Sequence, residues 1–188
     1  MNFIEKYDNI ISKQECEYLI NLFESCPFHV EGRAGGEINY EKKKGIGIDL
    51  FFKTDEENIV TEGNQRINEI ILPSVIECLN EYKKKYPLID KVSSWNIDNY
   101  YHIQRFKEDE GYYIIHCEQE GITSKRMLVW MIYLNDAKSG TRFYHQKLDM
   151  KAKAGRMVIW PAAWTHMHSG IIPNKGTKYI ATGWFSYD

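Results

Sequence analysis

The feature that most restricts the fold is an uninterrupted apolar run, Met127-Leu-Val-Trp-Met-Ile-Tyr-Leu134, in the second half of the chain. A strand with one face in water alternates apolar and polar residues, whereas a continuously apolar run is typical of a strand covered on both faces. The run is far shorter than the roughly 20 residues that span a bilayer. It therefore predicts a buried strand with other parts of the chain packed on both of its sides.

Other strands are predicted where aromatic and β-branched residues lie between turn residues. Residues 1–11 fit a short strand or an extended arm. The further predicted strands span residues 48–52, 95–106, 111–118, 141–145, 157–160 and 178–185. Most of the predicted strands thus lie in the second half of the chain.

Two segments before these strands have helical spacing of their apolar residues. The first begins at Ser12-Lys-Gln-Glu15, a capping-box pattern, and should end before Pro27. The second runs from about Glu57 to Tyr86, and Pro73 indicates either a kink or a new first turn within it.

Helices first and strands after indicate an α+β protein, whose short strands suit a sandwich or a jelly-roll (double-stranded β-helix) core. A length of 188 residues suits one domain over 1–188. Within it we expect helical support at about residues 12–86 and the jelly-roll core at about 93–186.

The composition restricts partners more than it restricts the fold. A net charge of -2 argues against a broad basic surface for nucleic acid, and no apolar run is long enough to cross a membrane. The N-terminus lacks the basic start and apolar core of a signal peptide. Four cysteines without zinc-like or disulfide-framework spacing favour reduced thiols in a cytoplasmic protein; they are Cys16, Cys26, Cys78 and Cys117.

The segment from residue 31 to 48 interleaves glycines with charges, including the run Glu41-Lys-Lys-Lys44. This composition suits a solvated, mobile loop. The alternative is a lid or a substrate-recognition loop, because long loops in compact domains often have such functions.

The strongest signal for a site is His116-Cys-Glu118, in the predicted strand 111–118. Residues i and i+2 of a strand project from the same face, so the imidazole and the carboxylate can reach one ion while Cys117 points away. His166 or His168 could complete a set of two nitrogens and one carboxylate, which suits non-heme Fe(II) with open coordination positions. A short pattern of this kind is also compatible with histidines that are merely part of the core.

Several motifs, taken in chain order, resemble the Fe(II)/2-oxoglutarate-dependent dioxygenase superfamily, and most closely its prolyl-4-hydroxylase-like branch. The motifs are His116-Cys-Glu118, Tyr133-Leu-Asn135, Gly155-Arg-Met-Val-Ile-Trp-Pro161, His168 and Lys178-Tyr-Ile-Ala-Thr-Gly-Trp184. They cover roughly residues 95–186, and the segment 161–170 is similar to forms often carried by bacteriophages. The resemblance implies a jelly-roll enzyme that uses Fe(II), 2-oxoglutarate and O2, with ascorbate as a candidate reductant. It would work in the cytoplasm, that of the host if the protein is viral.

The resemblance also implies roles for single residues. His116 and Glu118 would bind iron, and His168 is preferred to His166 as the distal ligand because relatives place that histidine ten residues before the basic residue that holds 2-oxoglutarate. That basic residue would be Lys178.

Four more residues receive roles from the same resemblance. Tyr133 would hydrogen-bond the carboxylate that Lys178 holds, and Trp184 would pack near the metal. Thr165 and Thr182 are candidates for a polar or packing role near 2-oxoglutarate.

The chain departs from the family at three positions. Glu118 replaces the aspartate of most relatives and leaves no room for the halide of a halogenase, which favours oxygenation. Phe106 stands where prolyl hydroxylases usually have a tyrosine. The candidates to replace its hydroxyl are Tyr100, Tyr101, Tyr112 and Tyr113. Arg142, in an altered turn, is a candidate for setting substrate preference.

The predicted function is hydroxylation of an unidentified substrate, with a prolyl residue of a peptide or protein as one candidate and a small molecule as another. Two alternatives come from other classes. One is a non-catalytic binding domain of cupin type, and the other is a zinc-type metal-dependent hydrolase or isomerase.

Overall fold

The apolar run forms a strand near the middle of the larger of two facing sheets. The computed structural model describes residues 1–34, 37–52 and 62–188. Its α-helices are α1 (Lys13–Ser25) and α2 (Glu62–Lys85). Its strands are β1 (Glu5–Tyr7), β2 (Val30–Glu31), β3 (Arg33–Ala34), β4 (Glu37–Ile38), β5 (Lys43–Lys44), β6 (Ile46–Phe51), β7 (Trp95–Phe106), β8 (Gly111–Tyr112), β9 (Arg126–Tyr133), β10 (Gly140–Phe143), β11 (Leu148–Lys151), β12 (Arg156–Pro161), β13 (His168–Ile171) and β14 (Lys178–Tyr187).

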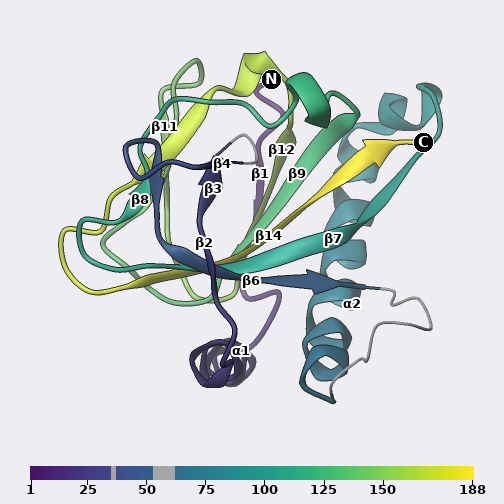
Figure 1. Ribbon diagram of the computed structural model, residues 1–188. Helices are drawn as coiled ribbons and strands as arrows, with labels where there is room; N and C mark the ends of the chain where they lie inside the picture. The colour runs from purple at the N-terminus through teal and green to yellow at the C-terminus, as the bar shows by residue number, and fades with distance from the viewer. Residues whose placement is uncertain (35–36, 53–61) are drawn as a thin grey trace.

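The large sheet is antiparallel, with strand order β1-β12-β9-β14-β7-β6-β2. A three-stranded sheet, β11-β10-β13, faces it, and two short ribbons pair β3 with β4 and β5 with β8. In Figure 1 the helices lie to one side of the large sheet and the smaller strands to the other. Two facing antiparallel sheets with helices outside confirm the predicted α+β class and its jelly-roll core.

The two faces of β9 belong to different apolar clusters, as expected for a strand covered on both sides. Leu128, Trp130 and Ile132 join a cluster that includes residues of both helices. Val129, Met131 and Tyr133 alternate with them and join a second cluster, which lies between the sheets. The helices therefore support the large sheet from behind and leave its other face to the interior of the jelly roll.

Both helices are close to their predictions. Ser12 and Glu15 form the expected capping box at the start of α1, and α1 ends two residues before Pro27. The second helix is continuous through Pro73, so that proline does not begin a new helix. The predicted first residues of this helix, 57–61, lie outside the described residues.

The predicted strand 111–118 is wrong. Only Gly111 and Tyr112 form a strand, paired with β5, and His116 makes an isolated bridge to His168. The argument that strand alternation turns Cys117 away falls with it, and Cys117 borders the central cavity. In the predicted strand or arm 1–11, only Glu5–Tyr7 forms a strand. The six other strand predictions are confirmed to within two residues at either end.

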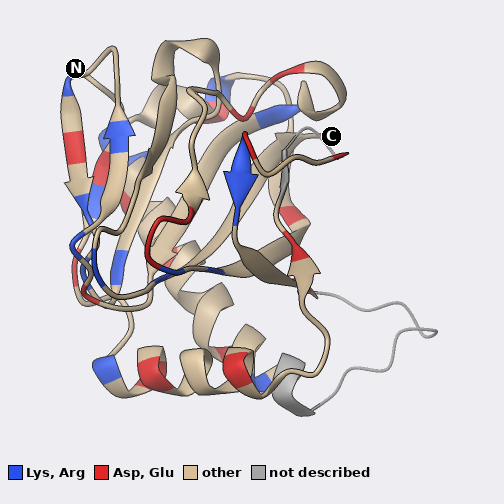
Figure 2. Ribbon diagram, turned by 60° about the vertical axis from the view of Figure 1, so that its left-hand side comes forward, with Lys and Arg blue, Asp and Glu red and all other residues tan. Residues whose placement is uncertain are grey.

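Residues of both charge signs are interspersed along the described part of the ribbon in Figure 2. This distribution agrees with the net charge of -2. Neither α1 nor α2, the α-helices of the described part, has the length and apolarity needed to cross a membrane.

Candidate active site

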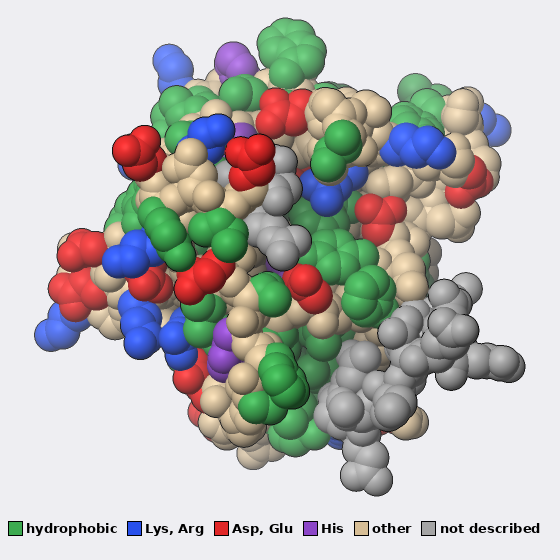
Figure 3. Space-filling view, viewed as in Figure 1, with side chains coloured by type: hydrophobic (Ala, Val, Ile, Leu, Met, Phe, Trp, Pro, Cys, Tyr) green, Lys and Arg blue, Asp and Glu red, His purple; other side chains and the backbone are tan. Residues whose placement is uncertain are grey.

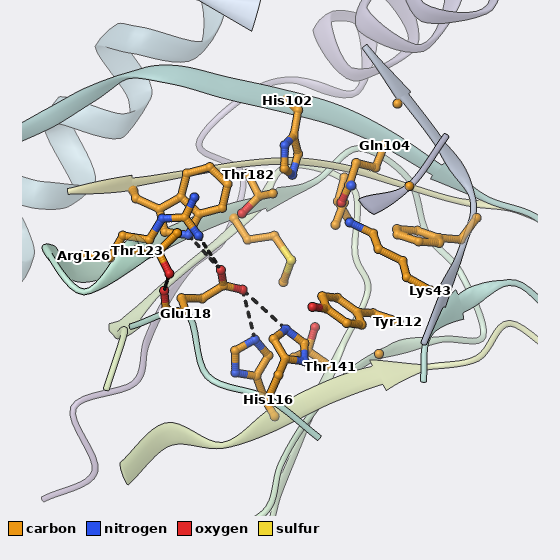
Figure 4. A pocket seen from close by; sticks show the side chains of 18 of the residues that line it. Lys43, His102, Gln104, Tyr112, His116, Glu118, Thr123, Arg126, Thr141 and Thr182 are labelled. Atoms are coloured by element: carbon orange, nitrogen blue, oxygen red, sulfur yellow. Dashed lines mark hydrogen bonds and ion pairs between the residues drawn. The ribbon is translucent and has the colours of Figure 1, made fainter. Parts of the chain in front are cut away.

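Three potential metal ligands from two segments far apart in the sequence meet inside the jelly roll. His116 and His168 form a backbone bridge, with N–H to O distances of 2.9 and 2.8 Å, which brings their side chains together. Glu118 Oε1 lies 3.4 Å from His116 Nε2 and 3.6 Å from His168 Nε2. The ligand atoms of all three residues lie within 4.8 Å of one another. Figure 4 shows the carboxylate pointing toward both rings.

Each histidine has its second ring nitrogen occupied by the backbone. His116 Nδ1 is 3.0 Å from Ile114 O, and His168 Nδ1 is 2.9 Å from His166 O. A carbonyl only accepts, so each Nδ1 donates, and each Nε2 is the nitrogen that faces Glu118 and is left for a metal. This arrangement is common for metal-binding histidines, whose other nitrogen donates to a fixed acceptor.

The carboxylate of Glu118 is held from the opposite side by two donors. Arg126 Nη1 and Trp184 Nε1 each donate to Oε2 at 3.1 Å, which leaves Oε1 toward the histidines. The Arg126 guanidinium also stacks 3.5 Å above the Trp184 ring. Burial opposes ionisation of Glu118, but the two imidazoles hold the pKa of its carboxyl well below the usual range. Glu118 is therefore an anion with one oxygen oriented toward a metal.

The three residues border a cavity of about 370 Å³ between the sheets. Such a volume is typical of small-molecule sites. Figure 3 shows hydrophobic side chains gathered over the middle of one face of the molecule, with acidic and basic side chains around them. The polar side chains of the cavity include Lys43, Gln104, Tyr112, Thr141, Lys178 and Thr182.

Lys178 projects into this cavity from the start of β14, and only 3% of it is exposed. Its Nζ donates to Gly140 O at 3.3 Å and lies 5.0 Å from the centre of the Phe106 ring. Burial lowers the pKa of Lys178 to about 8, which still leaves it mostly charged at neutral pH. Phe106, its cross-strand neighbour, thus faces the ammonium with a ring that carries no hydroxyl.

Trp184 and Thr182 line the cavity, whereas Tyr133 does not. The Tyr133 hydroxyl donates to Thr141 Oγ1 at 2.8 Å, and Thr141 itself borders the cavity. Thr182 Oγ1 donates to Trp130 O. Thr141 therefore lies between the Tyr133 hydroxyl and the cavity. In this arrangement Tyr133 could influence a bound carboxylate only through Thr141, and a direct hydrogen bond would require the Tyr133 side chain to move.

Other predicted residues lie elsewhere. His166 Nε2 is 2.8 Å from Asn2 O and its Nδ1 is 2.9 Å from Thr165 Oγ1, so neither residue joins the three-ligand group. Arg142 forms a two-contact ion pair with Asp149 and is not among the cavity-lining residues of the described chain.

Of the four tyrosines considered as replacements for the missing hydroxyl near Phe106, two border the cavity. Tyr100 and Tyr112 line it, whereas the Tyr101 and Tyr113 hydroxyls donate to Asn68 and to Asp109 O. Burial, with the charge of Glu118, raises the pKa of Tyr112 to about 12, so its hydroxyl stays protonated.

Sequence reasoning missed three residues of the site. Arg126 starts the buried strand eight residues after Glu118, a position where a charge needs a partner. Lys43 belongs to a run of three lysines, and in a strand successive side chains point to opposite faces, so one lysine of the run points inward. His102 is half-buried beside the Tyr100 hydroxyl, and desolvation together with the Lys43 charge lowers its pKa to about 3. None of these roles has a signal in spacing alone.

The three-ligand group fits a metal of the first transition series. Ligand nitrogens and oxygens lie about 2.0–2.2 Å from such ions, so their mutual distances must be within about twice that value. The distances of 3.4 and 3.6 Å from Glu118 to the two histidines meet this requirement, and all three ligand atoms lie within 4.8 Å of one another. Two imidazoles and one carboxylate, open to a cavity on the remaining side, form the donor set of non-heme Fe(II) enzymes.

Comparisons with known proteins agree with this geometry. Residues 101–186 match the family model of the 2OG-Fe(II) oxygenase superfamily, where 2OG is 2-oxoglutarate. No curated protein sequence matches the chain. A similar solved structure is the viral collagen prolyl hydroxylase vCPH of Paramecium Bursaria Chlorella virus-1 in its 2OG complex, with a TM-score of 0.71 and 19% identity. That comparison covers 100% of this chain and 97% of the other.

Two cellular prolyl hydroxylases share the fold as well. The Trichoplax adhaerens enzyme, solved with a hypoxia inducible factor peptide fragment, has a TM-score of 0.71 at 12% identity, covering 99% of this chain and 84% of the other. The Pseudomonas putida prolyl-4-hydroxylase has a TM-score of 0.66 at 12% identity, covering 99% and 94%. The matched residues 101–186 contain the ligand group and Lys178 on the shared fold, so this part of the chain is similar to the 2OG-Fe(II) oxygenase superfamily, whose members use Fe(II), 2-oxoglutarate and O2.

Proposed function

We propose that this enzyme hydroxylates an aliphatic C–H bond, with a prolyl residue of a peptide or protein as the first candidate substrate. The observation that carries the proposal is that the three-ligand group and the buried Lys178 border the same cavity. The likeness to prolyl hydroxylases over nearly the whole chain supports the choice of candidate.

In this proposal His116, Glu118 and His168 hold Fe(II), and Lys178 binds the distal carboxylate of 2-oxoglutarate. When bound, iron and 2-oxoglutarate supply the oxidising chemistry, with succinate and carbon dioxide as products. Arg126 and Trp184 keep Glu118 Oε2 occupied, so that the carboxylate presents a single oxygen to the metal. Trp160 and Phe143 pack against the His168 ring at centroid distances of 5.2 and 5.6 Å and exclude water from that side.

Gly170 keeps a path open to the ammonium. A Cβ placed there would lie 3.6 Å from Lys178 Nζ and 3.4 Å from backbone atoms of Tyr112. Any longer side chain would occupy the space in front of the lysine. This supports the proposal that the co-substrate carboxylate binds at that place.

The test is a turnover assay with protein purified without oxygen and then supplied with Fe(II), 2-oxoglutarate and O2. Succinate is measured with and without proline-containing peptides, and peptide products are examined by mass spectrometry for the gain of one oxygen atom. We expect Lys178→Ala to lose 2-oxoglutarate binding, while the exposed Lys175→Ala behaves as wild type. Unchanged 2-oxoglutarate binding in Lys178→Ala would refute the assignment of that residue.

The distal ligand has its own test. Loss of metal affinity is expected in His168→Ala and not in His166→Ala, because His166 is hydrogen-bonded to Asn2 and Thr165 outside the group. The opposite result would make His166 the ligand.

A further inference from the structure

Lys43 is a second buried cation in the cavity, and the roles proposed so far do not use it. Only 6% of it is exposed, although it belongs to a segment rich in glycine and charge. It pairs with Tyr112 across the β5–β8 ribbon, and its Nζ lies 5.1 Å from the centre of the Tyr112 ring. Its stem packs on Gly32, where an added Cβ would come within 3.3 Å of Lys43 Cγ and Cε. The side chain is thus fixed in place and points into the cavity (Figure 4).

The ammonium has no anionic partner of its own within the described residues. No carboxylate of that part of the chain lies within 4.0 Å of Lys43 Nζ, and its one charge contact there is the Tyr112 ring. Of the acidic groups that attract it, Asp49 accepts a hydrogen bond from Tyr100 and Glu118 is held by Arg126. Burial lowers the pKa of Lys43 to about 8, so it is mostly charged at neutral pH. Burying an unpaired charge is costly, and native proteins rarely do so without a partner or ligand.

In the loaded site the buried positive charges outnumber the negative ones. The charges of Fe(II) and the 2-oxoglutarate dianion cancel. Among the buried or half-buried groups around them, Glu118 is offset by Arg126, and Lys178 has the proposed role of binding the distal carboxylate. Lys43 then adds a positive charge that no group in the proposed catalytic arrangement neutralises. The other acidic groups that the structure describes on the cavity wall are exposed; they are Glu31, Asp49 and Glu120.

Lys43 also lies close to the metal ligands. The Tyr112 ring, over which the ammonium sits, stacks on His116 with ring centroids 3.7 Å apart and an interplanar angle of 21°. One aromatic ring therefore separates the lysine from a metal-binding imidazole. A molecule held by Lys43 would have neighbouring carbon atoms within reach of the reacting centre.

We propose that Lys43 binds a carboxylate of the primary substrate and thereby holds that substrate beside the three-ligand group. The proposal rests on the proposed function, which it deepens by naming the substrate class: a molecule that carries a carboxylate near the C–H bond to be oxidised. Gln104, buried on β7 and lining the same cavity, is a second polar group for that carboxylate. The carboxylate can belong to a free amino acid or other small acid, or to an acidic peptide residue.

The first test uses the smallest carboxylate as a probe. Protein loaded with Mn(II) and saturated with 2-oxoglutarate is titrated with acetate or with acetamide at constant ionic strength, and the melting midpoint is followed. Acetate should stabilise the wild type more than acetamide does, and Lys43→Met should bind acetate at least tenfold more weakly. Lys44→Met, a change at the exposed neighbour on β5, should retain the wild-type response. Equal effects of acetate and acetamide on the wild type, or an unchanged response in Lys43→Met, would overturn the proposal.

A second measurement separates the primary substrate from 2-oxoglutarate. By calorimetry on Mn(II)-loaded protein, the 2-oxoglutarate dissociation constant should stay within twofold in Lys43→Met and rise at least tenfold in Lys178→Met. An equal loss in both variants would place Lys43 in the co-substrate site and contradict the proposal. If even the wild type fails to bind 2-oxoglutarate, the proposed function fails, while the acetate comparison still tests Lys43 on the Mn(II)-loaded protein.

The source of the carboxylate is tested with two probe pairs. One pair is L-proline and L-prolinamide, and the other is a capped peptide that contains glutamate and its glutamine counterpart. In each pair, the affinity for the member with the carboxylate is compared with the affinity for its amide counterpart. The source of the carboxylate is the pair in which the wild type binds the carboxylate member more tightly and Lys43→Met does not. A lack of such a preference in both pairs counts against the proposal. Folding is checked by the melting midpoint of Lys43→Met without ligands, which should equal or exceed that of the wild type because a buried unpaired charge is removed.

Discussion

At the scale of single residues, the longer side chain of Glu118 is matched by the groups that hold it. Two donors occupy Oε2, so the additional methylene does not leave the carboxylate free to rotate. Arg126 in turn lies flat on Trp184. The three side chains act as one unit, in which the indole N–H and the guanidinium fix the direction of the oxygen that faces the histidines.

This unit predicts that Trp184→Phe lowers metal affinity. The change removes the N–H that donates to Glu118, and loss of such a supporting hydrogen bond typically lowers metal affinity by about 10–100-fold. Mn(II) binding by equilibrium dialysis measures the effect. Trp164, which is 69% exposed, provides the matched control, and Trp164→Phe should bind Mn(II) as the wild type does. Equal affinities for all three proteins would show that the indole has no such role.

Lys178 predicts a pH dependence of 2-oxoglutarate binding. Because burial lowers its pKa to about 8, the free protein loses this charge as the pH rises through 8, while the ligand stays a dianion. Affinity should therefore be full below that pH and, at pH 9, about tenfold lower than at pH 7. Lys178→Arg keeps its charge throughout and should flatten the profile, as titration calorimetry can show. A profile that falls equally in the arginine variant would point to another titrating group.

At the scale of elements, the long regular segments were predictable and the irregular one was not. The strand 95–106 has its predicted bounds, and α1 begins and ends where its capping box and proline indicate. The segment after Tyr112 fails as a strand because its backbone bonds to three different partners. Tyr113 N–H donates to Lys42 O, His116 N–H to His168 O and Glu118 N–H to Ala162 O. The local pattern of apolar and polar residues does not indicate which segment a backbone N–H will hydrogen-bond to.

The same distinction applies to the site. His116, Glu118, His168 and Lys178 could be selected because the resemblance to a known family supplies the separation between the distal histidine and the basic residue. Their roles at the site stay predictions. Lys43 was not distinguishable from its neighbours, since its burial depends on the pairing of β5 with β8. The burial of Lys43 is therefore determined by tertiary packing and not by the local sequence pattern.

Gly155 is the element-scale position that predicts the sharpest loss of stability. It lies in the turn between β11 and β12 with φ +71°, and an added Cβ would lie 2.3 Å from O of Ile11 in the N-terminal segment. Gly176 has a similar φ of +83° but nothing within 4 Å. Gly176→Ala should lower the unfolding free energy by about 1–2 kcal/mol, and Gly155→Ala by roughly twice that or more. Urea denaturation compares them, and equal losses would mean that the contact with Ile11 relaxes without effect.

At the scale of the whole molecule, helices and large sheet share one apolar cluster, which includes Leu19 and Phe23 of α1, Ile71 and Val75 of α2 and Trp130 of β9. We propose that residues 1–188 unfold as one domain. The ligand group is then linked to the stability of the entire fold, because its three residues come together only when the sheets face each other.

This linkage predicts stabilisation by metal. At 100 times its dissociation constant, Mn(II) should add about 2.7 kcal/mol, a rise of roughly 5–11 °C in melting midpoint for a protein of this size. A chelator should reverse the rise, and His116→Ala should abolish it. The midpoint is read by circular dichroism and by tryptophan fluorescence, and separated transitions in the two signals would contradict a single domain.

The alternation along β9 has a consequence for how the protein tolerates mutation. Met131 borders the cavity, where water can reach a polar substitute, whereas Ile132 faces the helix-side cluster. Met131→Gln should leave most of the folded protein intact and change its turnover, while Ile132→Gln should reduce the amount of folded protein, because a buried amide without partners is costly. In a mutational scan of this strand, polar substitutions should lower the abundance of the protein at every second position. At the positions between, they should lower its activity and leave its abundance largely unchanged.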